Sequence, residues 1–181
     1  FLYFADRISQ LPVGVIGVAI GTALLPLLSR QIVSGKFNKA IYTQNRSIQL
    51  SLIIAVPATV SLIIISFPIV STLFERGMFV SSDTRSIALA LVGYSIGIPA
   101  YILIKIFTSI YFAHQDTTTP VKIAIVAVFI NLILNISLVW SFQHVGLAVA
   151  TAISAWVTII LLSFGLIKRG WWKIDSKLKI S

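Results

Sequence analysis

Residues 123–167 read IAIVAVFINLILNISLVWSFQHVGLAVATAISAWVTIILLSFGLI, and no residue in this run carries a formal charge. A helix needs roughly 20 apolar residues to cross the hydrocarbon core of a bilayer, so the run is too long for a single crossing. The more polar stretch Ser141-Phe142-Gln143-His144, followed by Gly146, divides it. The run therefore predicts two membrane helices, at about 121–141 and 146–167.

The rest of the chain repeats this pattern of uncharged runs separated by charged loops. Three further uncharged runs lie nearer the N-terminus, at 8–29, 47–74 and 86–104. The spans that they predict are about 8–28, 48–73 and 87–112. The predicted fold class is therefore all-α, a polytopic transmembrane bundle of five spans. We expect the membrane bundle to occupy residues 1–168 and a basic cytoplasmic tail to occupy residues 169–181.

Composition excludes several classes of protein. Hydrophobic residues make up 57% of the chain and charged residues 10%, whereas a soluble domain carries about 25% charged residues. The net charge is +9, but the basic residues lie between apolar runs and not on one face interleaved with aromatics, so we expect no nucleic-acid partner. The chain has no cysteine, which excludes disulfides and thiolate chemistry. We expect no cofactor and no metal.

Because the chain opens on Phe1 inside an apolar stretch, we expect it to be part of a longer protein.

The charges in the loops predict the orientation. The loop at 29–46 has four basic residues and no acid, whereas the loop at 75–85 balances two acids with two bases. A basic excess returns at 105–122 and at 168–181. Since Lys and Arg hold loops on the cytoplasmic side, the N-terminus is predicted to lie outside and the C-terminus inside.

The dipeptide Asp6-Arg7 lies within or at the edge of the first predicted span. A charge at mid-bilayer costs about 2.5–3.5 kcal/mol, so it is kept where it faces a cavity, a partner or a ligand. Arg7 and Gln10 share a helical face with Gly17, and the fork of the guanidinium suits a phosphate or pyrophosphate. We interpret Arg7 as a cation facing a water-filled cavity. The alternative is a glycine packing seam in which Asp6 neutralises Arg7.

Polar residues inside the later spans are further candidates for binding. Lys105 lies within the third span, and its side chain either faces the cavity or reaches back to the cytoplasmic surface. Asn131 and Asn135 are one turn apart in the fourth span. They either join helices by hydrogen bonds or contact a substrate.

Three strings of residues together resemble the lipid II flippase family (MurJ/MviN), which belongs to the multidrug/oligosaccharidyl-lipid/polysaccharide exporter superfamily. The resemblance covers about residues 1–168. The strings are Ala5-Asp6-Arg7 with Leu11-Pro12-x-Gly14-Val15-x-Gly17, Leu73-Phe74-Glu75-Arg76-Gly77-x-Phe79, and Gln115-Asp116-Thr117-x-Thr119-Pro120-Val121-Lys122.

The resemblance implies a transporter and not an enzyme. The family fold is a fourteen-helix, two-lobed bundle with a cationic central cavity, and this chain would supply the eighth to twelfth helices. The implied function is translocation of lipid II, the undecaprenyl-pyrophosphate-linked peptidoglycan precursor, across the bacterial inner membrane by alternating access. Arg7 would be the family's essential cavity cation and Asp6 its acidic neighbour. The implied partners are lipid II, membrane lipids and the N-terminal lobe, which is missing from this chain.

Three other functions remain as alternatives. One is another lipid-linked polysaccharide or multidrug exporter of the same superfamily. The second is a membrane-embedded transferase, which needs clustered acids to hold a metal-diphosphate. The acids of this chain are widely separated: Asp6, Glu75, Asp83, Asp116 and Asp175. The third is an interaction protein that transports nothing.

Overall fold

The structure is a computed structural model that describes residues 2–74 and 81–173. Within these ranges every regular element is a helix, which confirms the predicted all-α class. In the part of the chain that the structure describes, five helical segments are long and apolar enough to cross a membrane. The elements are α1 (Leu2–Pro12), the π-helical turn η1 (Val13–Val18), α2 (Ala19–Val33), α3 (Phe37–Ile64), α4 (Ser66–Phe74), α5 (Ser81–Ala113) and α6 (Thr118–Lys168). The motif residues at 75–80 and most of the predicted tail, 174–181, lie outside the described residues.

The first span is one continuous helix with a widened turn in its middle. α1, η1 and α2 together run from Leu2 to Val33. The π-helical turn η1 follows Pro12, which has no N–H to donate to the preceding turn. Such π-helical insertions relax the hydrogen-bond ladder where a regular α-helix is interrupted. Because the span begins at Leu2, Asp6 and Arg7 lie inside the helix.

The second predicted span, 48–73, does not form a single helix. α3 ends at Ile64 and α4 begins at Ser66, with Ile65 between them at φ −100° and ψ 16°. Pro68 explains the break, because it cannot donate the hydrogen bond that the carbonyl of Ile64 would accept in a continuous helix. The spanning helix is therefore Phe37–Ile64, which begins earlier and ends earlier than the sequence predicted.

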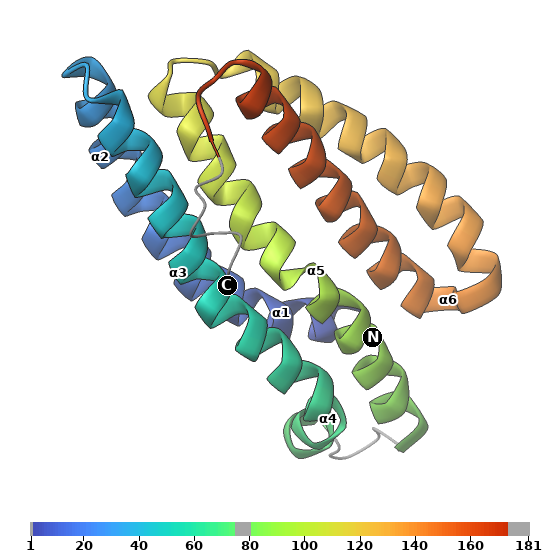
Figure 1. The fold of residues 1–181 in the computed structure, drawn as a ribbon. Helices are drawn as coiled ribbons and strands as arrows, with labels where there is room; N and C mark the ends of the chain where they lie inside the picture. The colour runs from blue at the N-terminus through green and yellow to red at the C-terminus, as the bar shows by residue number, and fades with distance from the viewer. Residues whose placement is uncertain (1, 75–80, 174–181) are drawn as a thin grey trace.

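The two halves of α6 form an antiparallel hairpin, with the chain reversing between the spans Thr118–Trp140 and Val145–Lys168 (Figure 1). The Ser154 hydroxyl donates to the carbonyl of Ala127 at 2.9 Å and joins the two halves. At the reversal, a Cβ added to Gly146 would lie 2.5 Å from the carbonyl oxygen of Leu138. The absence of a side chain at Gly146 thus allows this close approach.

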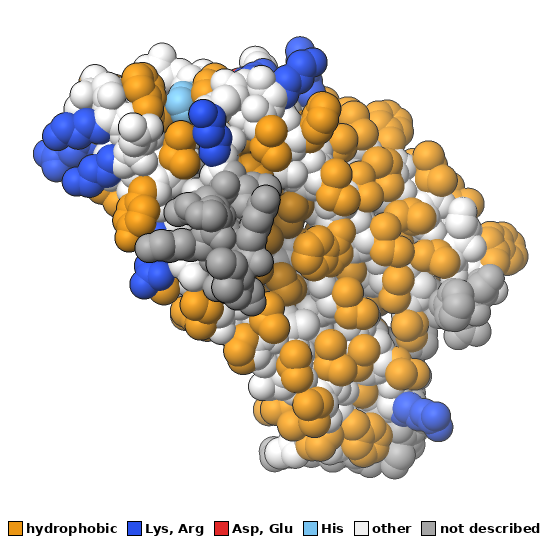
Figure 2. All heavy atoms as spheres, in the orientation of Figure 1, with side chains coloured by type: hydrophobic (Ala, Val, Ile, Leu, Met, Phe, Trp, Pro, Cys, Tyr) orange, Lys and Arg blue, Asp and Glu red, His pale blue; other side chains and the backbone are white. Residues whose placement is uncertain are grey.

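α5 is the centre of the bundle and contacts every other element. Of its most apolar stretch, 67% is buried, compared with 0% for the span Thr118–Trp140. The exposed surface of that span is apolar, as at Ile133 and Trp140. Figure 2 shows hydrophobic side chains spread over one face of the bundle, with most of the visible Lys and Arg towards its upper end and a further basic side chain near its lower end. This distribution is that of a helix bundle whose outer face meets lipid.

Candidate ligand-binding cavity

A cavity of about 360 Å³ lies between α1, α5 and the second half of α6. It brings together three of the residues that the sequence singled out: Asp6, Gln10 and Lys105. The rest of its wall is Ser9, Val13, Tyr101, Ile104 and Thr151. An anion, an amide and a cation thus meet in an otherwise apolar protein, which allows the cavity to bind a polar, charged ligand.

Asp6 and Gln10 form one side of the cavity and are fixed to each other. They lie one turn apart on α1, and the Gln10 amide donates to a carboxylate oxygen of Asp6. The Gln10 carbonyl oxygen accepts from the guanidinium of Arg7 at 3.5 Å. Arg7 does not line the cavity. Its side chain is exposed on the neighbouring face of α1, with its guanidinium carbon 5.1 Å from the centre of the Tyr3 ring.

Lys105 forms the opposite side and extends from the central helix α5. Its stem crosses the first span at Gly17 in η1, where an added Cβ would lie 2.8 Å from the Cδ atom of Lys105. Lys105 also lines a second hollow of about 430 Å³, which Gly21, Thr22 and Ser109 share. The glycine seam and the cavity lysine, which the sequence presented as separate features, are therefore parts of one arrangement.

Asn131 and Asn135 lie on the first half of α6 and bond to each other. The Asn135 amide donates to the side-chain oxygen of Asn131 at 2.9 Å, so this bond lies within one helix. Asn131 lines a third hollow of about 280 Å³, which shares Tyr101 and Thr151 with the cavity. Asn135 lines none of these three hollows.

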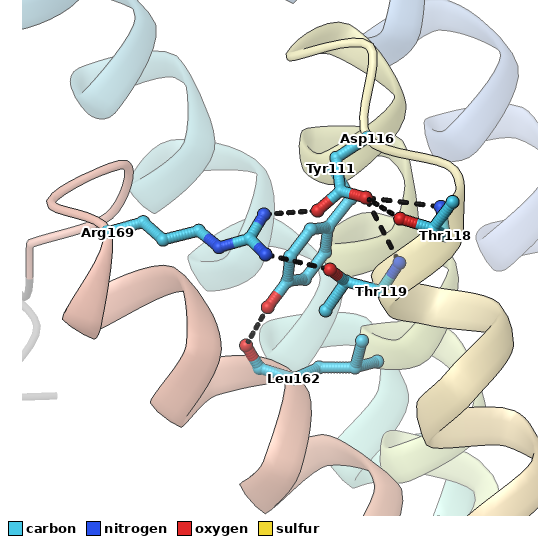
Figure 3. A network of polar contacts seen from close by, with 6 residues as sticks. All are labelled: Tyr111, Asp116, Thr118, Thr119, Leu162 and Arg169. Atoms are coloured by element: carbon cyan, nitrogen blue, oxygen red, sulfur yellow. Dashed lines mark hydrogen bonds and ion pairs between the residues drawn. The ribbon is translucent and has the colours of Figure 1, made fainter.

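A separate polar network closes the end of the bundle where α5 meets α6 (Figure 3). Asp116 accepts the backbone N–H groups of Thr118 and Thr119 and caps the start of α6. Sequence analysis had not assigned this role to Asp116. Arg169, after the end of α6, forms an ion pair with Asp116 and donates to the Thr119 hydroxyl at 2.8 Å. Tyr111 donates to the carbonyl of Leu162 at 2.9 Å.

The pKa values of two groups in this end region are displaced. Burial raises the pKa of Asp116, but hydrogen bonds from Thr119, Arg169 and Thr118 outweigh it and hold the pKa well below its usual range. Burial lowers the pKa of His114, whose ring stacks on Trp171 with centroids 4.1 Å apart. Neither Asp116 nor His114 lines the cavity. We therefore attribute these pKa shifts to contacts that hold the helices together at this end of the bundle.

Trp172 also joins helices at this end of the bundle, although its place beside basic residues is typical of an interfacial tryptophan. It is 7% exposed and packs on Phe107. Its indole N–H donates to Asn45 at 2.8 Å, and Asn45 in turn donates to the carbonyl of Lys173 at 2.9 Å. The segment after α6 therefore binds α3 as well as α5.

Comparison with known proteins decides the family. The family model "Lipid II flippase MurJ" matches residues 1–181. The chain belongs to the MurJ lipid II flippase family. A probable lipid II flippase MurJ of Rhizobium meliloti (strain 1021) is 42% identical over 177 residues, which are 98% of this chain and 33% of the relative. The corresponding protein of Vibrio cholerae is 36% identical over 98% of this chain and 34% of its own length.

A solved structure supports the same conclusion for the MurJ fold. A lipid II flippase MurJ in an inward closed conformation superposes with a TM-score of 0.85 at 30% identity, covering 99% of this chain and 37% of that one. The present chain spans about a third of the length of the relatives that it matches.

Three polar residues of the cavity wall were not among the candidates that the sequence singled out: Ser9, Tyr101 and Thr151. Tyr101 stands one turn before Lys105, so the shared face was the signal that could have identified it. Thr151 lies on a different helix, and only packing brings it to the cavity. Among the residues that the structure describes, no group of three His, Cys, Asp or Glu side chains could hold a metal ion.

Proposed function

We propose that this chain is part of a lipid II flippase, a transporter and not an enzyme. The whole protein would move the undecaprenyl-pyrophosphate-linked peptidoglycan precursor across the bacterial inner membrane by alternating access. The observation that carries the proposal is the meeting of Asp6, Gln10 and Lys105 in one cavity between spanning helices. Charged groups are expensive inside a bilayer and are retained for function. Membership of the MurJ family supports lipid II as the ligand that this cavity would bind.

Each site residue has a role in this proposal. Lys105 and Arg7 bind the phosphates of the substrate as cations. Gln10 orients Arg7 through their hydrogen bond, and Asp6 holds Gln10 in place. Asn131 contributes its amide N–H groups to the polar head group, and Asn135 holds Asn131 in place through their hydrogen bond. The polyprenyl tail stays among membrane lipids, and Arg7, on the exposed face of α1, faces the N-terminal lobe of the transporter.

The orientation of the chain is part of the proposal. The turn between α2 and α3, the turn between α5 and α6 and the end of α6 lie at the same end of the bundle (Figure 1). Most of the Lys and Arg side chains visible in Figure 2 lie towards that end. By the positive-inside rule, that end is cytoplasmic and the N-terminus lies on the periplasmic side.

A chimaera tests the function. Residues 1–181 replace the matching third of the Rhizobium meliloti relative, and the product is expressed in a strain depleted of its own lipid II flippase. We expect the chimaera to sustain growth, and Lys105→Met to abolish it. Loss of a hydrogen bond to a charged group costs about 1.5–3 kcal/mol, or roughly a ten- to hundredfold loss of affinity.

The control is Lys122→Met, which removes an exposed lysine outside the cavity. Two results would contradict the proposal. In the first, cells grow although the wild-type chimaera has no flippase activity. In the second, both Lys105→Met and Arg7→Ala keep full activity. Protein amounts in the membrane are compared by immunoblot, so that loss of activity is separated from loss of protein.

A further inference from the structure

The Tyr101 side chain lines two of the hollows, and its hydroxyl group is buried. Tyr101 lines the cavity that contains Lys105 and also the hollow that contains Asn131. Its hydroxyl is inaccessible to solvent and has no hydrogen-bond partner within the part of the chain that the structure describes. An unpaired hydroxyl in such a place destabilises a fold, so a partner is expected in the working protein.

Packing holds the Tyr101 ring in this position. Gly97 lies one turn earlier on α5, and a Cβ added there would lie 2.8 Å from the Cε2, Cζ and Oη atoms of Tyr101. The ring thus folds back over the bare backbone of Gly97, and α5 itself sets where the hydroxyl lies. Thr151, which lines the same two hollows, already donates to the carbonyl of Leu147 at 2.9 Å. Among the described residues of this shared wall, the Tyr101 hydroxyl is therefore a donor without a partner.

We infer that the Tyr101 hydroxyl is a substrate-binding group that donates a hydrogen bond to a phosphate or sugar oxygen of the lipid-linked head group. The inference rests on the proposed function and adds a contact that the cations do not supply. Lys105 provides charge, which attracts any phosphate, whereas a fixed phenol requires an acceptor oxygen at one place. The shared wall also lets Tyr101 serve a head group that extends from Lys105 towards Asn131.

The test compares two tyrosines on α5 that differ in their partners. The chimaera described above is purified with Tyr101→Phe or with Tyr111→Phe, and its lipid II affinity and its unfolding temperature without ligand are measured. We expect Tyr101→Phe to weaken lipid II binding about tenfold and to leave the unfolding temperature unchanged or raised. Tyr111→Phe removes the bond to Leu162, so it lowers the unfolding temperature and leaves the affinity within about twofold.

The outcomes separate this inference from the proposed function. A drop in unfolding temperature for Tyr101→Phe with unchanged affinity means that the hydroxyl has a protein partner, and it overturns the inference. Unchanged affinity in Tyr101→Phe while Lys105→Met loses binding overturns the inference and leaves the function standing. Failure of the wild-type chimaera to bind lipid II overturns the function itself.

A polyprenyl pyrophosphate without sugars serves as a second probe. Equal weakening of both ligands assigns the contact to phosphate, weakening of lipid II alone assigns it to sugar, and either supports the inference.

Discussion

At the scale of single residues, Asp116 both caps a helix and forms an ion pair. It caps the start of α6 through the N–H groups of Thr118 and Thr119, and it pairs with Arg169 beyond the end of the same element. Arg169 also lies over the ring of Trp171, with its guanidinium carbon 4.8 Å from the ring centre. The two ends of the α6 hairpin are thereby fastened together.

Replacing Asp116 with Ala is expected to destabilise the chain by about 1–2 kcal/mol, because an N-cap contributes about 1 kcal/mol and an exposed ion pair up to about 1 kcal/mol. Asp116→Asn keeps the cap and loses only the ion pair, so its effect is the smaller of the two. Unfolding in detergent micelles measures both. Equal stability of wild type and Asp116→Ala would show that the network contributes nothing.

The same carboxylate makes this difference depend on pH. Because the folded protein holds the pKa of Asp116 below its usual value, the stabilisation is complete above about pH 4, the unfolded pKa of Asp. It is lost as the pH falls from there through the folded pKa. The gap in unfolding free energy between wild type and Asp116→Asn should therefore narrow at pH 3 relative to pH 7.

At the scale of elements, the α6 hairpin depends on a close backbone approach. The two halves meet where Gly146 faces the carbonyl of Leu138, and Ser154 joins them further along. The two candidate spans in α6, Thr118–Trp140 and Val145–Lys168, lie close to the predicted 121–141 and 146–167. The cap at the start of α6 is Asp116, whose carboxylate accepts the free N–H groups of both Thr118 and Thr119.

Gly146→Ala is expected to destabilise the chain by about 1–3 kcal/mol, the usual cost of overpacking. The added methyl would lie 2.5 Å from a backbone oxygen, which cannot rotate away. Gly14→Ala is the matched control, since a Cβ at Gly14 meets nothing within 4 Å. Chemical unfolding in micelles compares the two variants, and equal stabilities would argue against the tight reversal.

At the scale of the whole molecule, α5 organises the bundle and leaves one side open. It is surrounded by α1, α3 and α6, yet Lys105 on this central helix remains exposed to the hollows beside α1 and α2. The arrangement matches a third of a known MurJ structure. The polar ends of the bundle predict which side of the membrane each turn faces.

Single cysteines test this orientation directly, because the chain has no cysteine of its own. In the full chimaera, made cysteine-free elsewhere, Ser34→Cys marks the basic end and Trp140→Cys, 86% exposed, marks the opposite end. In intact cells we expect a membrane-impermeant thiol reagent to label Trp140→Cys and to label Ser34→Cys only after lysis. The reverse pattern would invert the proposed orientation.

The sequence by itself determined that this protein crosses a membrane as five helices, because the length and spacing of uncharged runs decide that without any tertiary contact. It also identified Asp6, Gln10 and Lys105 as unusual, because a polar group within an apolar span stands out in one dimension. The resemblance to the family was carried by three strings of residues, of which the first contains Asp6.

Only the tertiary structure decided which of these residues share a cavity. Asp6 and Lys105 line one cavity because the first span packs across α5, with Gly17 of η1 against the stem of Lys105, and neither helix alone contains that information. The structure likewise placed Arg7 on the exposed face beside the cavity, divided the second span at Ile65, and brought Tyr101 and Thr151 to one wall. The physical reason is that hydrophobicity along a chain specifies which segments enter the membrane, whereas the contacts between helices depend on side-chain shape at each crossing.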